Sequence, residues 1–258
     1  MAEPTRRALL RSAAAAAAAA AATTALPRAA RALGPGSQLR ICELVLEQGT
    51  ATRPEAWKRL LFEVIQSTSV ECDPTPVALS PEDPALFAHP FSVLIGTGSL
   101  PELSDRAVEQ LVRYLSYGGF LLVDDASGSP DGAFNRSLRA LTTRLFPTRP
   151  LSPLPGDHSI FRSFFLLDRP VGRTAEASAL QGITIGPTSP LVLCADDLSG
   201  ALDRGPDGRD RYPVTPGGDW QRREALKLGV NLVLYALTSN YQHDTAHVLE
   251  LMREGSLE

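Results

Sequence analysis

Apolar residues are distributed along residues 39–241 in two patterns, short continuous runs and stripes with a spacing of three or four. The continuous runs end in Gly, Asp or Pro, which is typical of strands buried on both faces of a sheet. The stripes predict helices with one buried face. In chain order, the patterns predict strands within 39–47, 70–80, 90–99, 120–125 and 190–197, and helices within 53–68, 103–119, 133–146 and 222–241.

The predicted helices carry end signals that agree with their apolar stripes. Pro54 suits the first turn of the first helix. Ser104 can cap the second helix, and one of the two glycines that follow it can end it in a left-handed conformation. The expected buried residues are Trp57, Leu60, Leu61, Val64 and Ile65 in the first helix, Val108, Leu111, Val112 and Leu115 in the second, and Phe134, Leu138, Leu141 and Leu145 in the third.

This order of elements predicts a single α/β domain over residues 39–242. Strands that alternate with helices of this length favour a mostly parallel sheet with helices on both faces, a three-layer sandwich. The sequence contains no internal repeat that would indicate another architecture. Residues 243–258 are expected to form a helical tail.

The first 32 residues have the pattern of an export signal rather than of a domain. Arg6 and Arg7 precede an unbroken alanine run over 13–22, and Ala30-Arg31-Ala32 has the small-x-small form of a cleavage site. The paired arginines resemble a twin-arginine signal. A frayed Ala-rich helix or a disordered tail is the alternative. We expect a twin-arginine-type signal peptide over 1–32, cleaved after Ala32, a linker over 33–38, and a mature protein that is periplasmic or extracellular.

Charge and hydropathy narrow the classes of partner. The chain has a net charge of −4, and residues 1–32 contain five Arg and one Glu, so the remaining chain carries −8. Nucleic acids and anionic membranes are bound through clustered Lys and Arg, so no nucleic-acid partner is expected. No later apolar run approaches the roughly 20 residues that span a bilayer. After signal cleavage, the protein is therefore not expected to be an integral membrane protein.

The three cysteines, Cys42, Cys72 and Cys194, each lie in a predicted strand. An odd number argues against a disulfide framework, and buried free thiols are the simplest interpretation. A Cys42–Cys72 bridge is the alternative if their strands are neighbours. Cys194 is followed by Ala195 and Asp196 rather than by the tight glycine turn of an exposed nucleophile, so covalent cysteine catalysis is not expected.

Acidic side chains gather where the predicted strands end. Asp124 and Asp125 end the strand within 120–125, and Asp197 ends a later strand. In open α/β sheets, ligands bind outside the carboxyl ends of the strands. A Pro- and Gly-rich loop carrying Asp157 could fold over the same edge. The candidate ligand rim consists of Asp124, Asp125, Asp157, His158, Asp197 and Glu224.

Two kinds of chemistry would use this rim. Asp125, His158 and Asp197 could hold a divalent cation, Ca²⁺ or Mg²⁺ if oxygen ligands dominate and Zn²⁺ or Mn²⁺ if His158 binds. Alternatively, neighbouring carboxylates could raise one another's pKa and act as acid and base in hydrolysis. The structural alternative is that Asp125 and Asp197 only cap the turns or helices that follow them.

Three long segments combine these features: "LFAHPFSVLIGTGSLPELSDRAVEQLVRYLSYGGFLLVDDA" (86–126), "LFPTRPLSPLPGDHSIFRSFF" (145–165) and "REALKLGVNLVLYALTSNY" (223–241). Together they resemble the bacterial domain-of-unknown-function family 4159, over about residues 39–241. The resemblance implies a class I glutamine-amidotransferase-like fold, which is flavodoxin-like. It also implies neighbours in envelope or stress-linked bacterial systems, including MoxR-type ATPases and von Willebrand A proteins that are encoded nearby. It implies no particular reaction.

The sequence departs from true amidotransferases at the nucleophile. Those enzymes carry a Cys in a G-x-C-x-G turn, whereas here paired aspartates and Ala126 follow the corresponding apolar run. No glutamine amidotransferase activity is therefore expected. The favoured hypothesis is an exported, non-enzymatic module that binds a protein partner or a small polar ligand at the rim. The alternative is a metal-assisted hydrolase-like enzyme that acts on a polar envelope substrate.

Overall fold

The computed structural model describes residues 38–127, 132–177 and 179–253, with the side chains of the last helix described up to residue 239. The predicted signal peptide and all but the last residue of the predicted linker lie outside the described residues. The end of the predicted tail, 254–258, lies outside them as well. From Leu39 onward the chain forms one compact unit.

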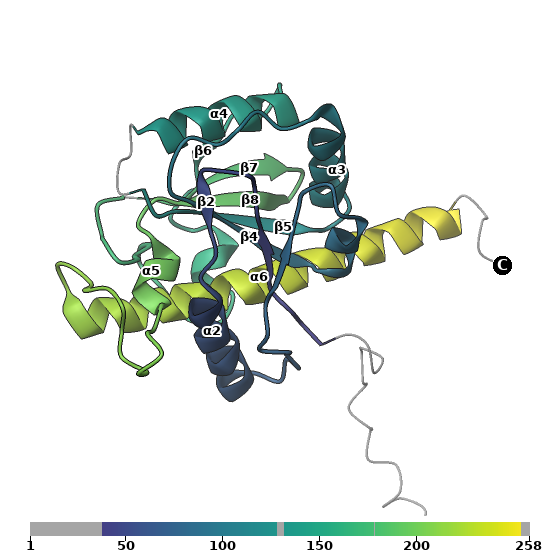
Figure 1. The fold of residues 1–258 in the computed structure, drawn as a ribbon. Coiled ribbons are helices and arrows are strands. Elements are labelled where there is room, and N and C mark those ends of the chain that lie inside the picture. Colours follow the sequence, from purple (N-terminus) through teal and green to yellow (C-terminus); the bar gives the residue numbers. More distant parts are fainter. Residues whose placement is uncertain (1–37, 128–131, 178, 254–258) are drawn as a thin grey trace, which may run out of the picture. The chain divides into compact units, whose positions relative to one another are not determined.

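An eight-stranded sheet runs through the described part of the chain (Figure 1). Its strands lie in the order β3-β1-β4-β5-β8-β7-β6, and the short β2 pairs with β4 beside this path. The strands are β1 (Cys42–Leu44), β2 (Thr50–Ala51), β3 (Val77–Leu79), β4 (Phe91–Gly96), β5 (Phe120–Asp125), β6 (Ser152–Pro153), β7 (Gln181–Ile185) and β8 (Thr188–Cys194). The pairs from β3 to β8 are parallel, whereas β2, β6 and β7 join through antiparallel pairs. The sheet is therefore mixed and mostly parallel.

The five parallel strands have the order of a doubly wound sheet. Numbered by themselves along the chain, they lie in the order 2-1-3-4-5, which is the flavodoxin-like order. β4 and β5 occupy the middle of the sheet, and every residue of both strands is buried. Burial on both faces explains why these two strands are continuous apolar runs in the sequence.

Helices cover both faces of the sheet, which makes a three-layer α/β sandwich (Figure 1). One face carries α2 (Pro54–Ser67), α5 (Leu198–Leu202) and α6 (Gly218–Arg253), and the other carries α3 (Asp105–Ser116) and α4 (Ala133–Leu145). Two 3₁₀ turns, η1 (Pro84–Ala88) and η2 (Ser159–Arg162), lie in connections. An apolar core fills each space between sheet and helices. The predicted fold class is confirmed.

The predicted helix stripes face these cores, with one clear exception. Ser104 caps α3 as predicted, because its Oγ accepts a hydrogen bond from the N–H of Ala107 at 3.1 Å. In α2, Trp57 is fully buried, but Ile65 is 39% exposed, so its assignment to the core was wrong. Eight residues turn an α-helix by two full turns and about 80° more, which rotates Ile65 to the margin of the stripe. Val108 and Val112, on the margin of the α3 stripe, are only partly buried.

The last helix is longer than its apolar pattern. α6 begins at Gly218 and continues to Arg253, so the predicted helix and much of the predicted tail form one element. Residues 225–236 are mostly buried, because α6 packs against α2, α5 and η2 in its layer. None of the helices in the described part of the chain combines the length and apolar character needed to cross a bilayer.

Three strands were not predicted from the apolar pattern. β2 and β6 have two residues each, which is too short for any periodicity. β7 pairs with β8 through a two-residue hairpin, in which Ile185 lies opposite Thr188. Gly186 in this turn has φ of +58°, a conformation that glycine adopts without steric cost. β7 and β6 therefore extend the parallel sheet with an antiparallel edge.

The three cysteines are free and buried, as the simpler interpretation predicted. Cys42 lies opposite Val77 and Ser92 on the two strands beside β1. Cys72 instead lies opposite Leu39, at the other end of the same stretch. The register separates the two thiols, so the alternative of a Cys42–Cys72 bridge is wrong.

Candidate functional site

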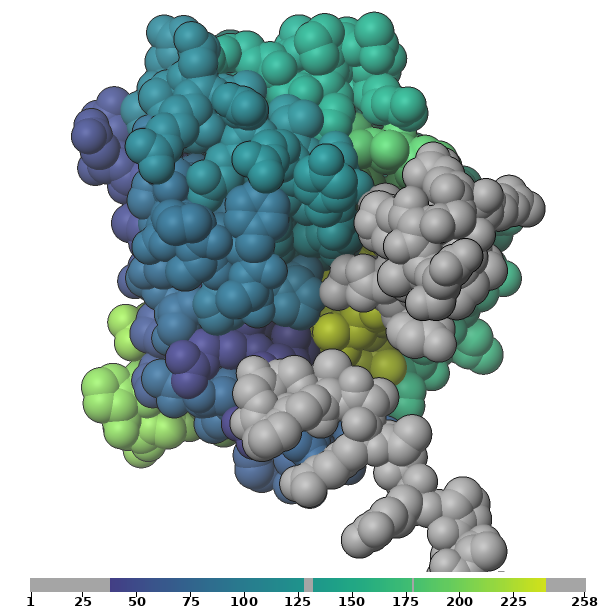
Figure 2. Space-filling view, turned by 90° about the vertical axis from the view of Figure 1, so that its right-hand side faces the viewer, coloured from purple at the N-terminus to yellow at the C-terminus, as the bar shows by residue number. Residues whose placement is uncertain are grey.

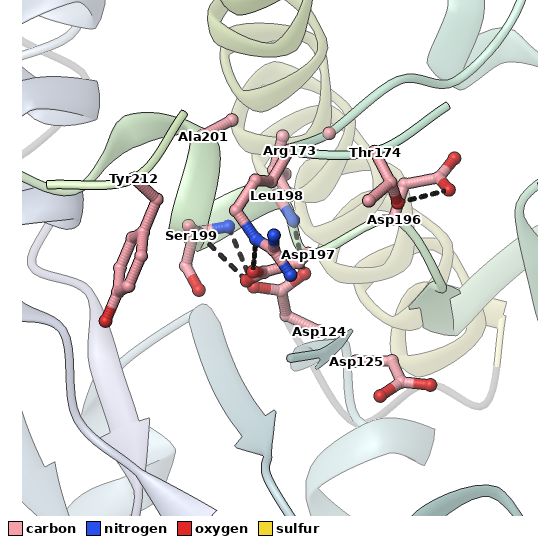
Figure 3. A network of polar contacts seen from close by, with 12 residues as sticks. Asp124, Asp125, Arg173, Thr174, Asp196, Asp197, Leu198, Ser199, Ala201 and Tyr212 are labelled. Atoms are coloured by element: carbon pink, nitrogen blue, oxygen red, sulfur yellow. Dashed lines mark hydrogen bonds and ion pairs between the residues drawn. The ribbon is translucent and has the colours of Figure 1, made fainter. Parts of the chain in front are cut away.

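Asp124 and Asp197 meet at the carboxyl ends of β5 and β8 (Figure 3). Asp124 is fully buried, and its two oxygens accept hydrogen bonds from the N–H groups of Leu198 at 2.7 Å and Ser199 at 2.8 Å. These N–H groups belong to the first turn of α5, where backbone donors have no partner inside the helix. Asp124 therefore anchors α5 to the end of a central strand.

Asp197 is the N-cap of α5 and the centre of an ion cluster. Its backbone is left-handed, with φ of 54°, a conformation that Asp and Asn tolerate better than most residues. Its Oδ1 accepts a hydrogen bond from the N–H of Gly200 at 3.0 Å, so the structural alternative considered for Asp197 is confirmed. The same carboxylate also pairs with Arg53, which precedes α2, and with Arg173, from the loop before β7.

Arg53 extends this cluster toward the surface. Its Nη1 also donates to Ser199 Oγ at 2.9 Å, and its Cζ lies 5.1 Å from the centroid of the Tyr212 ring, a cation–π contact. Only 12% of the Arg53 side chain is exposed, so its pair with Asp197 is largely shielded from water. Removing one partner of such a pair leaves an uncompensated charge, which makes the cluster a strong structural restraint.

The surroundings of Asp124 and Arg53 shift the pKa of both groups. Burial and the negative charge of Asp197 raise the pKa of Asp124 to about 7, although the Ser199 donors and Arg53 favour the carboxylate. Burial alone would lower the pKa of Arg53, but the charge and hydrogen bond of Asp197, together with the negative charge of Asp124, outweigh burial and raise this pKa. A raised carboxyl pKa is typical of catalytic acids. Here, however, both oxygens of Asp124 are occupied by backbone donors and hidden from solvent, so Asp124 cannot reach a substrate in this arrangement.

Glu43, which the sequence analysis missed, holds the start of α2. It is buried in β1, and its Oε1 accepts hydrogen bonds from the N–H of Arg53 at 2.6 Å and from Trp57 Nε1 at 2.9 Å. Burial raises the pKa of Glu43, and these two donors oppose the rise. A lone acidic residue inside an apolar run was the available signal. Arg53 and Arg173 left no comparable signal, because their partner is distant in the sequence.

Asp125 points away from Asp124 (Figure 3). Successive side chains of a strand alternate between its faces, so Asp125 turns toward α4 and Asp124 toward α5. Asp125 accepts hydrogen bonds from Ser127, at 2.9 Å from N and 2.6 Å from Oγ, and from Asn135 Nδ2 at 2.5 Å. It thereby fixes the turn after β5 and the first turn of α4, which is the structural role considered for it.

Asp196 holds the loop that carries Arg173. Its Oδ1 accepts hydrogen bonds from Thr174 Oγ1 at 3.0 Å and from the N–H groups of Glu176 and Ala177 at 2.9 and 3.1 Å. Its Oδ2 is buried and has no hydrogen-bond partner within the described residues. Because Asp196 fixes the residues directly after Arg173, it helps to place that arginine against Asp197.

His158 lies at the other end of the sheet from Asp197. Its Nε2 is 3.2 Å from Ser189 Oγ, near the start of β8, whereas Asp197 follows the end of this seven-residue strand. The loop that carries Asp157 and His158 therefore folds over the amino ends of the strands, and Asp157 is exposed beside it. The expectation that this loop covers the carboxyl ends is corrected by this placement.

The hydrogen bonds of His158 also argue against a Ser–His catalytic pair. Its Nδ1 accepts a hydrogen bond from the N–H of Ile160 at 3.3 Å, so the ring proton resides on Nε2 and points toward Ser189. A general base needs a free lone pair toward the hydroxyl that it activates. Ser189 is moreover fully buried.

The candidate cation ligands Asp125, His158 and Asp197 are likewise not brought together, since Asp125 faces α4 and His158 lies at the far strand ends. Glu224 lies within α6 and pairs with Lys227 at 2.7 Å. In the part of the chain that the structure describes, no three His, Cys, Asp or Glu side chains are arranged to hold a metal ion. Of the six rim residues, Asp124 and Asp197 form the cluster.

The crevice in which doubly wound sheets bind ligands is filled by the chain itself. This crevice lies between the carboxyl ends of β1 and β4, whose connecting helices lie on opposite faces. Here β2 pairs with the end of β4, with Thr50 opposite Gly96. The N–H groups of Thr97 and Gly98 donate to the carbonyl of Gly49 at 2.9 and 3.3 Å, so they are not available to an anion.

Two surface hollows lie beside α6 at the amino ends of the strands. One has a volume of about 310 Å³ and is lined mainly by apolar groups, including those of Leu115, Phe120 and Pro190. The other, of about 210 Å³, is lined mainly by polar groups and includes Arg162 and Tyr235. Figure 2 shows the yellow side chains of α6 reaching the surface in this region. Neither hollow includes Asp124 or Asp197.

Comparison with known proteins identifies the family but no activity. No curated protein matches the sequence. The model of the family described as "Domain of unknown function (DUF4159)" matches residues 40–237, a range that includes all strands of the described residues and the Asp124–Asp197 cluster. The chain therefore belongs to the DUF4159 family, as the sequence resemblance predicted.

Proposed function

We propose that this protein is exported and acts as a binding module without catalysis of its own. The observation that carries the proposal is the use of the strand-end carboxylates, since Asp124 and Asp197 hold α5, Arg53 and Arg173 instead of facing solvent. A protein partner in a bacterial envelope system, or a small polar ligand, is then bound by the mostly exposed residues 204–212, which follow the buried helix α5 that this cluster holds.

The thiols support binding rather than covalent catalysis. Burial raises the pKa of Cys42 to about 12 and that of Cys72 to about 11, and it raises the pKa of Cys194 well above the ordinary value. Because the thiolate is the nucleophile, these side chains are unreactive near neutral pH. Glutamine amidotransferase activity is accordingly not expected.

The protein purified after export is expected to contain no stoichiometric metal and to hydrolyse neither p-nitrophenyl phosphate nor p-nitrophenyl acetate above the rate in buffer. The reason is that the candidate ligands lie apart and the carboxylates of the cluster are already engaged. Elemental analysis by mass spectrometry measures the metal content, and absorbance assays measure the rate of hydrolysis.

Asp125→Asn and His158→Gln are the matched variants for this experiment. A stoichiometric metal that either substitution removes would support the alternative, a metal-assisted hydrolase acting on a polar envelope substrate. Hydrolysis that disappears in either variant while the fold persists would support the same alternative and overturn the binding-module proposal.

We further propose that Arg6 and Arg7 direct export by the twin-arginine route, with cleavage after Ala32. Arg6→Lys/Arg7→Lys is expected to leave full-length protein in the cytoplasm, because this route reads the arginine pair. Immunoblots of cell fractions measure the location and length of the chain, and Arg11→Lys is the control. Unchanged processing of the double variant would count against the twin-arginine route.

A further inference from the structure

A short hairpin after α5 places one carboxylate among three arginines. Residues Arg204 and Asp210 form an antiparallel bridge, and the N–H of Gly205 donates to the carbonyl of Arg209 at 2.8 Å. Gly208 makes the turn with φ of +75°, which favours glycine. The sequence "DRGPDGRD" is therefore an ordered hairpin, the light green loop beside α5 in Figure 1.

The three arginines reach Asp210 from three elements. Arg59 of α2 donates from Nη1 to Asp210 Oδ1 at 2.7 Å. Arg222 of α6 has its Nε 3.1 Å from Asp210 Oδ2, and Arg204 of the hairpin has its Nε 3.7 Å from Oδ1. The tertiary fold thus brings three guanidinium groups to a single carboxylate.

The single negative charge of Asp210 does not balance the charges of the three arginines. Three positive charges face one negative charge, and the other acidic groups of the hairpin are paired elsewhere, Asp203 with Arg211 and Asp207 with Arg209. Burial and the charge of Arg204 lower the pKa of Arg59, as expected where cations crowd together.

Arg222 independently indicates that a hydrogen-bond acceptor is missing at this site. Its side chain is 9% exposed, and its two terminal nitrogens donate to the carbonyls of Ala201 and Tyr212. Its Nε, although close to Asp210, makes no hydrogen bond with acceptable geometry within the described residues. A buried donor without an acceptor costs free energy that a better-placed acceptor would recover.

We propose that Arg59, Arg204 and Arg222 form a binding site for a phosphate-type dianion, in which Asp210 acts as an internal competitor. The site is open to solvent, because the side chains of Arg204 and Asp210 are 46% and 33% exposed. A phosphate group has the charge that matches the surplus of two positive charges. Its oxygens also suit the N–H groups of guanidinium ions, which bind phosphate and carboxylate in the same way. The site includes Arg204 and Asp210, which lie on the surface named in the proposed function, but its evidence is the set of arginine contacts alone. Failure to bind phosphate would leave the proposed export and partner binding unaffected.

The test compares the wild type with Asp210→Asn, which removes the internal negative charge without changing the size of the side chain. The dissociation constant for inorganic phosphate, measured by calorimetry at ionic strength held constant with sodium chloride, is expected to fall by at least about tenfold in the variant. Adding Arg204→Gln to this variant is expected to weaken phosphate binding again by about tenfold, because a charge-assisted hydrogen bond is lost. Arg209→Gln, on the same hairpin but 88% exposed, is the control and leaves binding unchanged.

Equal dissociation constants for the wild type and Asp210→Asn would overturn the proposal, as would phosphate binding that is insensitive to Arg204→Gln. If Asp210→Asn does not fold, Arg204→Gln alone in the wild-type chain must weaken phosphate binding for the proposal to stand. Glycerol 3-phosphate distinguishes the source of the anion: binding at least as tight as that of inorganic phosphate assigns the site to a phosphate monoester, and binding of inorganic phosphate alone assigns it to the free anion.

Discussion

Asp197→Asn is expected to lower the free energy of unfolding by about 3 to 5 kcal/mol, the range for removing one partner of a buried ion pair. The amide keeps the size of the side chain, can still accept the N–H of Gly200 and tolerates the left-handed backbone at this position. Only the negative charge is lost. Arg53 and Arg173 are then left without their carboxylate partner in a largely dry setting.

The change is measured as a shift of the thermal midpoint, on the order of 10 °C for a domain of this size. Asp207→Asn is the control, since Asp207 and its partner Arg209 are exposed and 3.8 Å apart, and such pairs contribute little. Adding Arg173→Gln to Asp197→Asn should restore part of the loss, because one uncompensated charge disappears. A midpoint for Asp197→Asn as close to the wild type as that of the control would contradict the role of the cluster.

The second large effect is a dependence of stability on pH that Asp124 causes. Its pKa is about 7 in the folded protein, and the ordinary value is 3.8. The folded state therefore holds a proton that the unfolded state has lost between these two values. The stability from Asp124 is complete below pH 3.8 and declines as the pH rises through 7. The difference between the two pKa values corresponds to at most about 4 kcal/mol.

Asp124→Asn isolates this contribution, because the amide resembles the protonated acid and does not titrate. At pH 5 the variant is expected to be less stable than the wild type by about 1 to 3 kcal/mol, since one of the N–H groups of Leu198 and Ser199 loses its acceptor. Between pH 5 and pH 8, the free energy of unfolding of the wild type should fall by about 2 to 3 kcal/mol relative to that of the variant. The gap between the two proteins therefore narrows or reverses at pH 8. Urea denaturation at the two pH values measures it. Parallel pH profiles for both proteins would show that Asp124 does not titrate in this range.

The sequence pattern was most informative where one segment decides its own structure. β4 and β5 are continuous apolar runs because both of their faces are buried, and α3 carries its cap and stripe within 103–119. The edge of the sheet was less predictable. β6 has two residues, one of which is Pro153, and among the described residues it pairs only with the strand β7. In β7 itself only two adjacent residues are buried, so its sequence carries little periodicity.

In the candidate site, too, the sequence predicted what is local and missed the contacts between distant segments. Placement of Asp124 and Asp197 at the carboxyl ends of strands followed from the chain alone, because parallel strands bring those ends to one edge. The sequence could not show that Arg53 and Arg173 neutralise Asp197, because these contacts join residues far apart along the chain. It also could not show that the loop with His158 folds to the opposite edge, because nothing local in a Pro- and Gly-rich loop selects its direction.

By itself, the sequence determined the layers of the fold, the central strands and the helices that cover them, because burial imposes a periodicity that each segment carries in its own residues. The tertiary structure alone decided the role of each charged residue. A carboxylate is a ligand, an acid or a helix cap according to the groups that face it, and for Asp124, Asp197 and Asp210 those groups come from other elements of the fold.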